Sequence, residues 1–198
     1  PLMDASNALL IFIKNPLAGR VKTRLATSLG EQEALRIYQQ LLQRALETTT
    51  PLSCTKYLYY SSFIDNHDQW SPKNFQKMLQ KGADLGIRMH HALQTALQKH
   101  GKAVLIGSDI PELNRLHIEE AFQALETADY VLGPAKDGGY YLVGMKDPAS
   151  TIFGEIPWST SEVMQLTLRR ILEEGKSYHL LPILSDIDYP EDWQQLGW

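Results

Sequence analysis

Short apolar runs alternate with amphipathic segments along this chain, and this alternation is the feature that most restricts its fold. Residues 8–13 and 103–106 are continuous apolar runs, as in strands buried on both faces of a parallel sheet. Residues 31–47 have apolar side chains at helical spacing along one face. Strands that alternate with helices predict an α/β fold with a mostly parallel sheet.

The remaining elements follow from the same periodicities and from turn and capping residues. Further strands are expected at 56–61, 74–79, 130–134, 140–143 and 178–184, and helices at 84–100, 113–127, 159–175 and from 190 onward. Asp84 is the expected N-cap of the second helix, and Ser159 with Glu162 forms the pattern of a capping box. The Asp-Gly-Gly turn at 137–139 predicts that the strand after it returns beside the strand before it.

The composition of the chain limits the partners that the protein can bind and the cellular location that we expect for it. The 198 residues, 43% of them hydrophobic, suffice for one domain with a sizeable core, in which residues 1–7 are interpreted as a flexible leader. A net charge of -4 offers no basic field for nucleic acid, and the single cysteine, Cys54, cannot form an internal disulfide. The run 8–13 is too short to span a bilayer and lacks the flanks of a signal peptide. We therefore expect a cytoplasmic protein that binds neither nucleic acid nor membrane; its oligomeric state stays open.

Asp109 follows the apolar run 103–106 within the sequence Gly-Ser-Asp-Ile-Pro, and Pro111 prevents simple continuation of the strand. In open α/β sheets, ligands bind at the carboxyl ends of the strands. A hard divalent cation prefers carboxylate oxygens and leaves coordination positions for phosphate. Asp109 is therefore a candidate metal ligand, with a simple turn cap before Pro111 as the alternative.

A second pair of carboxylates lies near the end of the chain. Strand-like alternation puts Asp186 and Asp188 on one face and Ile187 on the other. The pair is a candidate to complete the metal site of Asp109. Alternatively, Asp188 helps to start the helix at Pro190, since proline favours the first helical position.

A basic loop follows the first apolar run. It combines one glycine, three cations and one hydroxyl: Gly19, Arg20, Lys22, Thr23 and Arg24. Glycine permits close backbone approach, and the cations are suited to clamp phosphates. The second glycine of a P-loop is missing, so the loop predicts phosphate binding without that cradle. The alternative is a solvated basic turn.

The turn at 137–139 offers a third candidate surface. Its glycines, Gly138 and Gly139, form a wall on which Lys136 and Asp137 would face a small ligand. The alternative is a plain hairpin turn. Trp158, farther along, is either a lid or a hydrophobic staple at the start of a helix.

Six motifs in fixed order across residues 9–196 resemble a known bacterial family. They are Pro-x-x-Gly-x-x-Lys-Thr-Arg-Leu at 16–25, Gly-x-Asp-Leu-Gly-x-Arg-Met at 82–89, Ile-Gly-Ser-Asp-x-Pro at 106–111, Gly-Pro-Ala-x-Asp-Gly-Gly-Tyr-Tyr-Leu at 133–142, Trp-Ser-Thr at 158–160 and Asp-x-Asp-x-Pro-Glu-Asp at 186–192. The chain resembles the glycosyltransferase-A-like family labelled radical-SAM/selenodomain-associated transferase or arsenosugar-biosynthesis glycosyltransferase. The resemblance implies a nucleotide-diphospho-sugar transferase fold: a Rossmann-like, mostly parallel sheet with helices on both faces.

The resemblance also implies roles for residues of each motif. The cations of the basic loop would hold donor phosphates, and Asp109 would bind Mg²⁺ or Mn²⁺ with Asp186 or Asp188 as second ligand. Three residues would lie near the base or ribose: Asp84, Gly86 and Arg88. Residues 137–140, including Tyr140, would line the acceptor pocket.

The implied reaction is metal-dependent transfer from an activated nucleotide to a small acceptor. The residues predicted to take part in catalysis are Asp109, Lys22 and Asp137. Asp137 would act as the base toward the acceptor hydroxyl. Many glycosyltransferases of this fold have Asp-x-Asp at the metal strand, whereas this chain has Gly107 at the first position. A single Asp109 with a late aspartate resembles the arrangement of nucleotidyltransferases. From the family resemblance, the expected donor is a nucleotide sugar, with nucleotidyl transfer from an NTP and a non-catalytic nucleotide-binding module as alternatives.

Overall fold

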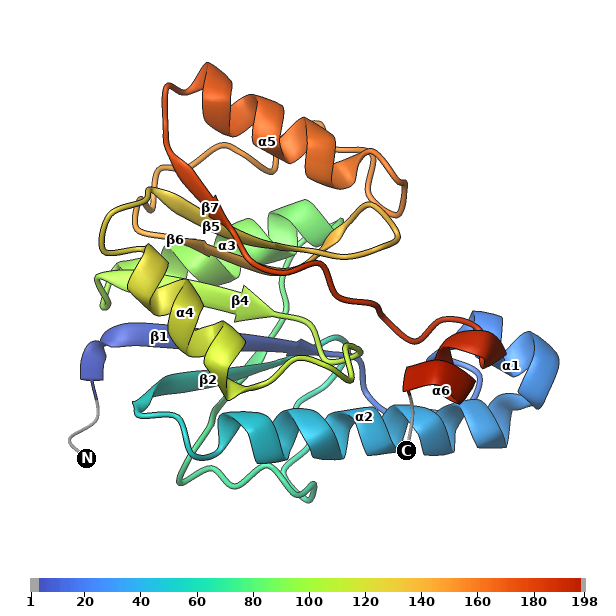
Figure 1. The fold of residues 1–198 in the computed structure, drawn as a ribbon. Helices are drawn as coiled ribbons and strands as arrows, with labels where there is room; N and C mark the ends of the chain where they lie inside the picture. Colours follow the sequence, from blue (N-terminus) through green and yellow to red (C-terminus); the bar gives the residue numbers. More distant parts are fainter. Residues whose placement is uncertain (1–3, 197–198) are drawn as a thin grey trace.

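The computed structural model describes residues 4–196, which form one seven-stranded sheet with helices on both faces (Figure 1). The strands are β1 (Asp4–Ile13), β2 (Cys54–Tyr60), β3 (Gln76–Leu79), β4 (Lys102–Ile106), β5 (Tyr130–Pro134), β6 (Tyr140–Met145) and β7 (Tyr178–Leu180). The helices are α1 (Thr23–Leu29), α2 (Glu31–Thr49), α3 (Leu85–Leu97), α4 (Arg115–Ala124), α5 (Val163–Glu173) and α6 (Pro190–Leu196).

The sheet has the order β3-β2-β1-β4-β6-β5-β7, in which β6 alone runs antiparallel to its neighbours. Because β6 returns directly from the turn at 137–139, it pairs with β5 as a hairpin and inserts beside β4. The predicted α/β class with a mostly parallel sheet is therefore confirmed.

Alternate residues of β1 supply the two halves of the core. Leu9 and Ile11 face α2 and α4, while Leu10 and Phe12 face α3 and α5. The central strands read as uninterrupted apolar runs because both faces are buried in this way. Cys54 is buried at the start of β2, as expected of a structural thiol.

Several boundaries differ from the predictions. Residues 4–7 belong to β1, so the leader expected through residue 7 is wrong there, and residues 1–3 lie outside the described part. The basic loop continues into α1, a seven-residue helix that the periodicity did not reveal. The strand expected at 178–184 ends at Leu180, and Leu184 makes only an isolated bridge to Ala135.

The helix caps were predicted with mixed success. Asp84 caps α3 as expected, since its carboxylate accepts a hydrogen bond from the Ile87 amide at 2.8 Å. The capping box of Ser159 and Glu162 is wrong: Ser159 has a left-handed backbone (φ 66°), and α5 begins only after Glu162. Instead, the Met164 amide donates to the Gly138 carbonyl at 2.8 Å, which ties the start of α5 to the hairpin turn.

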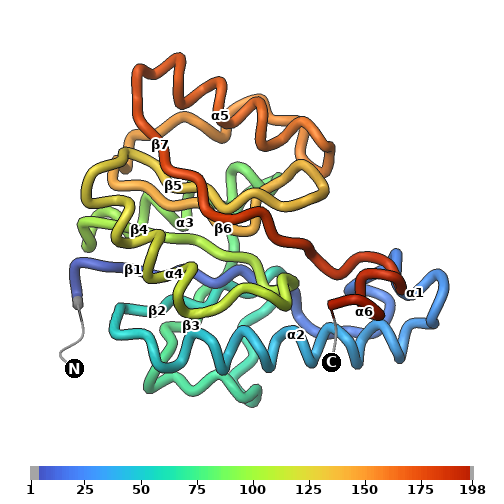
Figure 2. The backbone as a smooth tube through the Cα atoms, in the orientation of Figure 1, coloured from blue at the N-terminus to red at the C-terminus, as the bar shows by residue number. Residues whose placement is uncertain are grey.

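The carboxyl-terminal segment brings distant parts of the chain together. After β7 it crosses the carboxyl-end edge of the sheet and reaches α6, which packs beside α1 (Figure 2). Residues 186–188 therefore lie next to the loops after β1 and β4. Among residues 4–196, all helices are too short or too polar to cross a lipid bilayer.

Candidate active site

A cavity of about 590 Å³ opens at the carboxyl ends of β1 and β4. Three predicted surfaces contribute to its wall: the basic loop, the carboxylates of the metal prediction and the hairpin turn. The predicted site residues that line it are Arg20, Lys22, Thr23, Arg24, Asp109, Asp137, Gly139, Tyr140, Trp158, Asp186 and Asp188. Its volume lies within the range of small-molecule sites.

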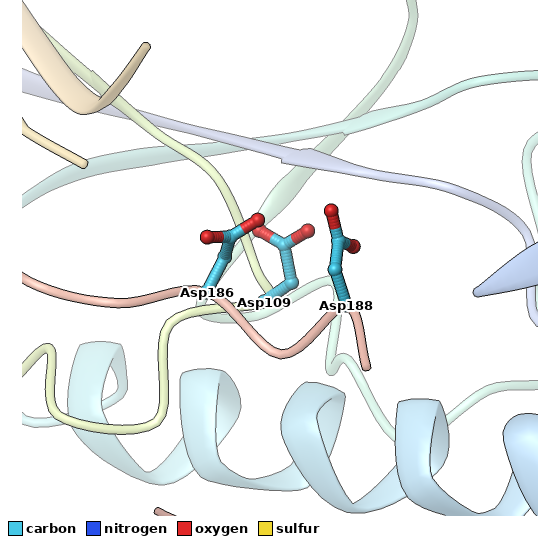
Figure 3. A group of neighbouring side chains, drawn as sticks. All are labelled: Asp109, Asp186 and Asp188. Atoms are coloured by element: carbon cyan, nitrogen blue, oxygen red, sulfur yellow. The ribbon is translucent and has the colours of Figure 1, made fainter. Parts of the chain in front are cut away.

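We define the acidic cluster as Asp109, Asp186 and Asp188, whose side chains lie side by side (Figure 3). All three line this cavity. Asp109 comes from the loop after β4, and the other two come from the segment between β7 and α6. One carboxylate oxygen from each lies within 4.8 Å of those from the other two. The Ile187 amide donates to the Asp109 carbonyl at 3.2 Å, and the Ile187 side chain is fully buried. This anchor explains why the two aspartates beside Ile187 face the cavity.

Lys22 inserts into the acidic cluster. Its Nζ lies 2.8 Å from Asp109 Oδ2 and 3.2 Å from Asp188 Oδ1, and its side chain is only 6% exposed. Arg24 makes a second ion pair with Asp188, at 2.7 Å between Nη1 and Oδ2. The Asp188 carboxylate therefore pairs with the basic loop and does not cap α6. Asp192 accepts from the amides of Asp188 and Tyr189 instead.

The pKa values of the site follow from this crowding. Burial raises the pKa of Asp186 to about 7, and repulsion from Asp188, Asp109 and Asp137 adds to the effect. Burial opposes ionisation of Asp109 as well, but the Lys22 ammonium holds the pKa of Asp109 below its usual value. Burial would likewise lower the pKa of Lys22, yet Asp109 and Asp188 together raise it above the usual range.

The acidic cluster fits a hard divalent cation. Three carboxylates provide only oxygen donors, which Mg²⁺ and Mn²⁺ prefer. Two oxygens on opposite sides of a Mg²⁺ ion are about 4.2 Å apart, since each Mg–O bond is about 2.1 Å. The three carboxylate oxygens lie within 4.8 Å of one another, which is close to that span, and in this structure the Lys22 ammonium bridges two of the carboxylates. Metal binding itself stays a prediction.

The other residues of the basic loop are arranged differently. Arg20 is exposed and lines the cavity, and among residues 4–196 no ion pair involves it. Thr23 begins α1 and also lines the cavity. Gly19 does not line it; its left-handed backbone (φ 72°) makes the turn beside Glu31. Arg20 is thus the cation of this loop that is most available to a phosphate.

The residues expected near the base or ribose serve local structure. Asp84 caps α3, and Arg88 Nε donates to the Gly82 carbonyl at 3.0 Å. Gly86 lies beneath Trp158: a Cβ at Gly86 would be 2.6 Å from Trp158 Cζ2. Asp84, Gly86 and Arg88 shape the cavity wall without lining it, whereas Trp158 lines it.

Gly86→Ala is expected to destabilise the protein by about 1–3 kcal/mol, because the new methyl group overlaps the Trp158 ring in a packed region. Urea unfolding measures the loss. The control is Gly101→Ala, where the nearest atom to a new Cβ is the Ser6 carbonyl oxygen at 3.8 Å. Combining Gly86→Ala with Trp158→Leu should recover part of the loss. If Gly86→Ala lowered the free energy of unfolding equally in the unmodified protein and in the Trp158→Leu variant, the overlap with Trp158 would not be the cause of the loss.

The hairpin turn places one carboxylate at the cavity. Asp137 Oδ1 accepts from the Gly139 amide at 2.9 Å, which leaves its other oxygen available to a ligand. Gly138 has φ 93°, and a Cβ there would lie 2.2 Å from the Ser161 carbonyl oxygen. Lys136 and Gly138 do not line the cavity, whereas Gly139 and Tyr140 do. Gly138 therefore allows the turn to pack against the segment before α5.

Sequence reasoning missed several residues of the cavity wall. Lys14, Tyr38, Gln80, Ser108 and residues 159–161 all line it. The Tyr38 hydroxyl accepts from the Lys14 amide at 2.8 Å and lies 3.2 Å from Ser108 Oγ, so it joins the loops after β1 and β4. The position of Lys14 directly after the first apolar run was a signal that could have identified it.

Comparison with protein families gives one match. The profile of a family described as uncharacterized proteins conserved in bacteria (DUF2064) matches residues 42–160. No curated protein matches the chain.

Comparison with solved structures gives matches over almost the whole chain. A candidate nucleotide-diphospho-sugar transferase from Desulfovibrio desulfuricans G20 is 30% identical, with a TM-score of 0.85 over 93% of this chain and 83% of that one. A CMP:2-keto-3-deoxy-manno-octonic acid synthetase complexed with CTP is 9% identical, with a TM-score of 0.56 over 98% and 97% of the chains.

Glucosyl-3-phosphoglycerate synthase from Mycobacterium tuberculosis, in complex with Mn²⁺, UDP and phosphoglyceric acid, is 10% identical. It has a TM-score of 0.58 over 98% of this chain and 75% of that one. At this identity, the synthetase and the synthase show the fold alone. The expectation of a transferase with the nucleotide-diphospho-sugar transferase fold agrees with these similarities.

Proposed function

This chain belongs to the DUF2064 family, and from that premise we propose that it is a metal-dependent transferase that moves a sugar from a nucleotide-sugar donor to a small acceptor. The observation that carries the proposal is the acidic cluster, whose three carboxylates share one 590 Å³ cavity with the exposed Arg20 and with Asp137. The 30%-identical relative, named as a candidate nucleotide-diphospho-sugar transferase, supports the same class of reaction.

Each wall of the cavity has a proposed task. The acidic cluster holds Mg²⁺ or Mn²⁺, which when bound supplies positive charge to the leaving diphosphate. Arg20, with Lys22, Thr23 and Arg24 of the same loop, binds the donor phosphates and holds them against the cluster. The base or ribose lies on the wall that Gly86, Asp84 and Arg88 shape.

The acceptor is proposed to lie against the hairpin turn and Trp158. The acceptor hydroxyl oxygen forms a bond to the anomeric carbon, while the bond from that carbon to the diphosphate breaks. Asp137 takes the hydroxyl proton, and a nucleoside diphosphate leaves. Tyr140 packs edge-on to Trp158, at 6.4 Å between ring centroids, and the pair forms an apolar side of this pocket.

Nucleotidyl transfer is the second candidate, and one observation favours it. The strand-end position before Asp109 that would complete Asp-x-Asp is Gly107, and the further acidic ligands come instead from Asp186 and Asp188. In this reaction an acceptor phosphate oxygen attacks the α-phosphorus of an NTP, and pyrophosphate leaves. The acceptor is therefore a phosphate or phosphosugar, and no base is needed. An arsenical acceptor forms no part of either proposal.

The test is a thermal-shift panel of NTPs and of UDP-, GDP-, ADP- and CDP-sugars, with and without Mg²⁺ or Mn²⁺. A ligand at about 100 times its Kd adds roughly 2.7 kcal/mol, and each kcal/mol raises Tm by about 2–4 °C at this chain length. We expect a metal-dependent shift of several degrees with one nucleotide sugar, larger than with its NTP. Asp109→Asn should abolish the metal dependence.

Product analysis with the best donor then separates the two reactions. Release of a nucleoside diphosphate supports glycosyl transfer, and release of pyrophosphate from an NTP supports nucleotidyl transfer. Ligand-induced shifts without any turnover would favour a non-catalytic nucleotide-binding module. The absence of a shift with every nucleotide would overturn the nucleotide-donor proposal.

A further inference from the structure

Lys22 is held at an unusual place for a cation of a phosphate-binding loop. Its ammonium bridges Asp109 and Asp188, at 2.8 and 3.2 Å, and the side chain is 6% exposed. By contrast, Arg20 of the same loop is exposed and makes no ion pair within residues 4–196. The loop thus presents one cation to the cavity and directs another into the acidic cluster.

The backbone of Lys22 directs its side chain inward. Lys22 has φ 47° and ψ 48°, a left-handed conformation that residues other than glycine, asparagine and aspartate seldom adopt. The chain is anchored before and after Lys22, since Val21 directly before it and Leu25 in the first turn of α1 are buried in the core. A residue persists in this conformation only where its surroundings hold it there, and such residues concentrate at functional sites.

A divalent ion and the Lys22 ammonium need the same oxygens. An ion that binds the acidic cluster requires oxygens of Asp109 and Asp188 at about 2.1 Å, and both carboxylates already accept hydrogen bonds from Lys22 Nζ. Two cations this close also repel each other strongly in a partly buried site. The ion and Nζ therefore cannot both occupy the space between the two carboxylates.

The charge balance of the acidic cluster also favours exchange of the Lys22 ammonium for a divalent ion. When all three carboxylates of the cluster are ionised, the two bound cations, Lys22 and Arg24, leave one negative charge in excess. A divalent ion in place of the ammonium neutralises the cluster together with Arg24. Lys22 lines the same cavity as Arg20, so a released ammonium stays beside the proposed donor phosphates.

We propose that Lys22 is the resident cation of the acidic cluster and that a divalent ion displaces it, so that metal loading releases the Lys22 ammonium to the donor phosphate. This inference rests on the metal site of the proposed function. Lys22 keeps the cluster together without metal and weakens metal binding by competition. The cluster therefore binds its ion best when a phosphate is present to accept Lys22.

Mn²⁺ titration of Lys22→Met tests the competition. Removing the competing ammonium is expected to tighten Mn²⁺ binding at least tenfold relative to the unmodified protein. The matched control is Arg20→Met, which removes the same charge from the same loop without contact to the three carboxylates; its effect should stay within about threefold. Mn²⁺ should also raise the Tm of Lys22→Met more than that of the unmodified protein.

Chemical labelling of lysines tests whether metal releases the Lys22 ammonium from the acidic cluster. It uses the unmodified protein, so the result does not depend on whether a variant folds. An amine-reactive reagent should modify Lys22 slowly without metal and several-fold faster with saturating Mn²⁺, as measured by peptide mass spectrometry. The internal control is Lys56, which is 6% exposed and donates to the carbonyls of Thr50 and Leu52 far from the cluster. Its labelling should not change.

The outcomes separate this inference from the proposed function. Mn²⁺ binding that is equal or weaker in Lys22→Met, or Lys22 labelling that saturating Mn²⁺ leaves unchanged, overturns the displacement and leaves the metal site standing. Absence of Mn²⁺ binding to both the unmodified protein and Lys22→Met overturns the metal site and the displacement together.

Discussion

Asp109→Asn is expected to lower turnover by about a thousandfold while the protein stays folded. Asp109 contributes to the proposed metal site from the end of β4, and removing one preorganised electrostatic contact of this kind typically costs 10²–10³ in rate. Asparagine keeps the size of the side chain and a hydrogen-bond acceptor for Lys22. The measurement is the rate of donor consumption at saturating donor and metal, together with Mn²⁺ affinity.

The control for Asp109→Asn is Glu112→Gln. Glu112 is an exposed carboxylate three residues along the same loop and does not line the cavity. Its substitution should leave both turnover and Mn²⁺ affinity unchanged. If Asp109→Asn turned over the donor at the normal rate, Asp109 would have no part in metal-dependent catalysis.

Asp137→Asn is expected to lower glycosyl transfer by about 10²–10⁴-fold, because it removes the proposed base toward the acceptor hydroxyl. Asparagine retains an oxygen that can accept the hydrogen bond of the Gly139 amide, so the turn keeps its shape. The loss should therefore appear in kcat, with donor affinity nearly unchanged. Single-turnover kinetics with donor and acceptor, alongside donor binding by titration, measure the two effects separately.

The chain offers a matched control for Asp137→Asn. Asp147 Oδ1 accepts from the Ala149 amide at 2.8 Å in the same type of turn, after the carboxyl end of the antiparallel strand β6. Asp147 thus lies at the opposite edge of the sheet, and Asp147→Asn should not change turnover. Full activity of Asp137→Asn would remove Asp137 from the role of base; with pyrophosphate as product, that result would agree with nucleotidyl transfer to a phosphate acceptor.

Much of the architecture was decided by local sequence. Apolar runs such as 103–106 specify buried strands, and helical spacing specifies the faces of α2 and α3, because each pattern repeats within a few residues. The same reasoning placed Asp109 just after the carboxyl end of β4, which ends at Ile106. The Asp-Gly-Gly turn likewise predicted the β5–β6 hairpin.

Long-range packing decided what each charged residue does. From sequence, Lys22 was expected to hold donor phosphates and to take part in the reaction, but the structure pairs it with Asp188, 166 residues away. Local contacts remain important for two residues: Asp84 caps α3 as predicted and Arg88 donates to the Gly82 carbonyl, while their place near the nucleotide stays a prediction. Trp158 lies over Gly86 because two motifs meet across the cavity. Periodicity encodes which face of a helix or strand is buried. Which charged side chains meet depends on the order of the strands and on the path of the carboxyl-terminal segment. Only the tertiary structure fixes that order and that path.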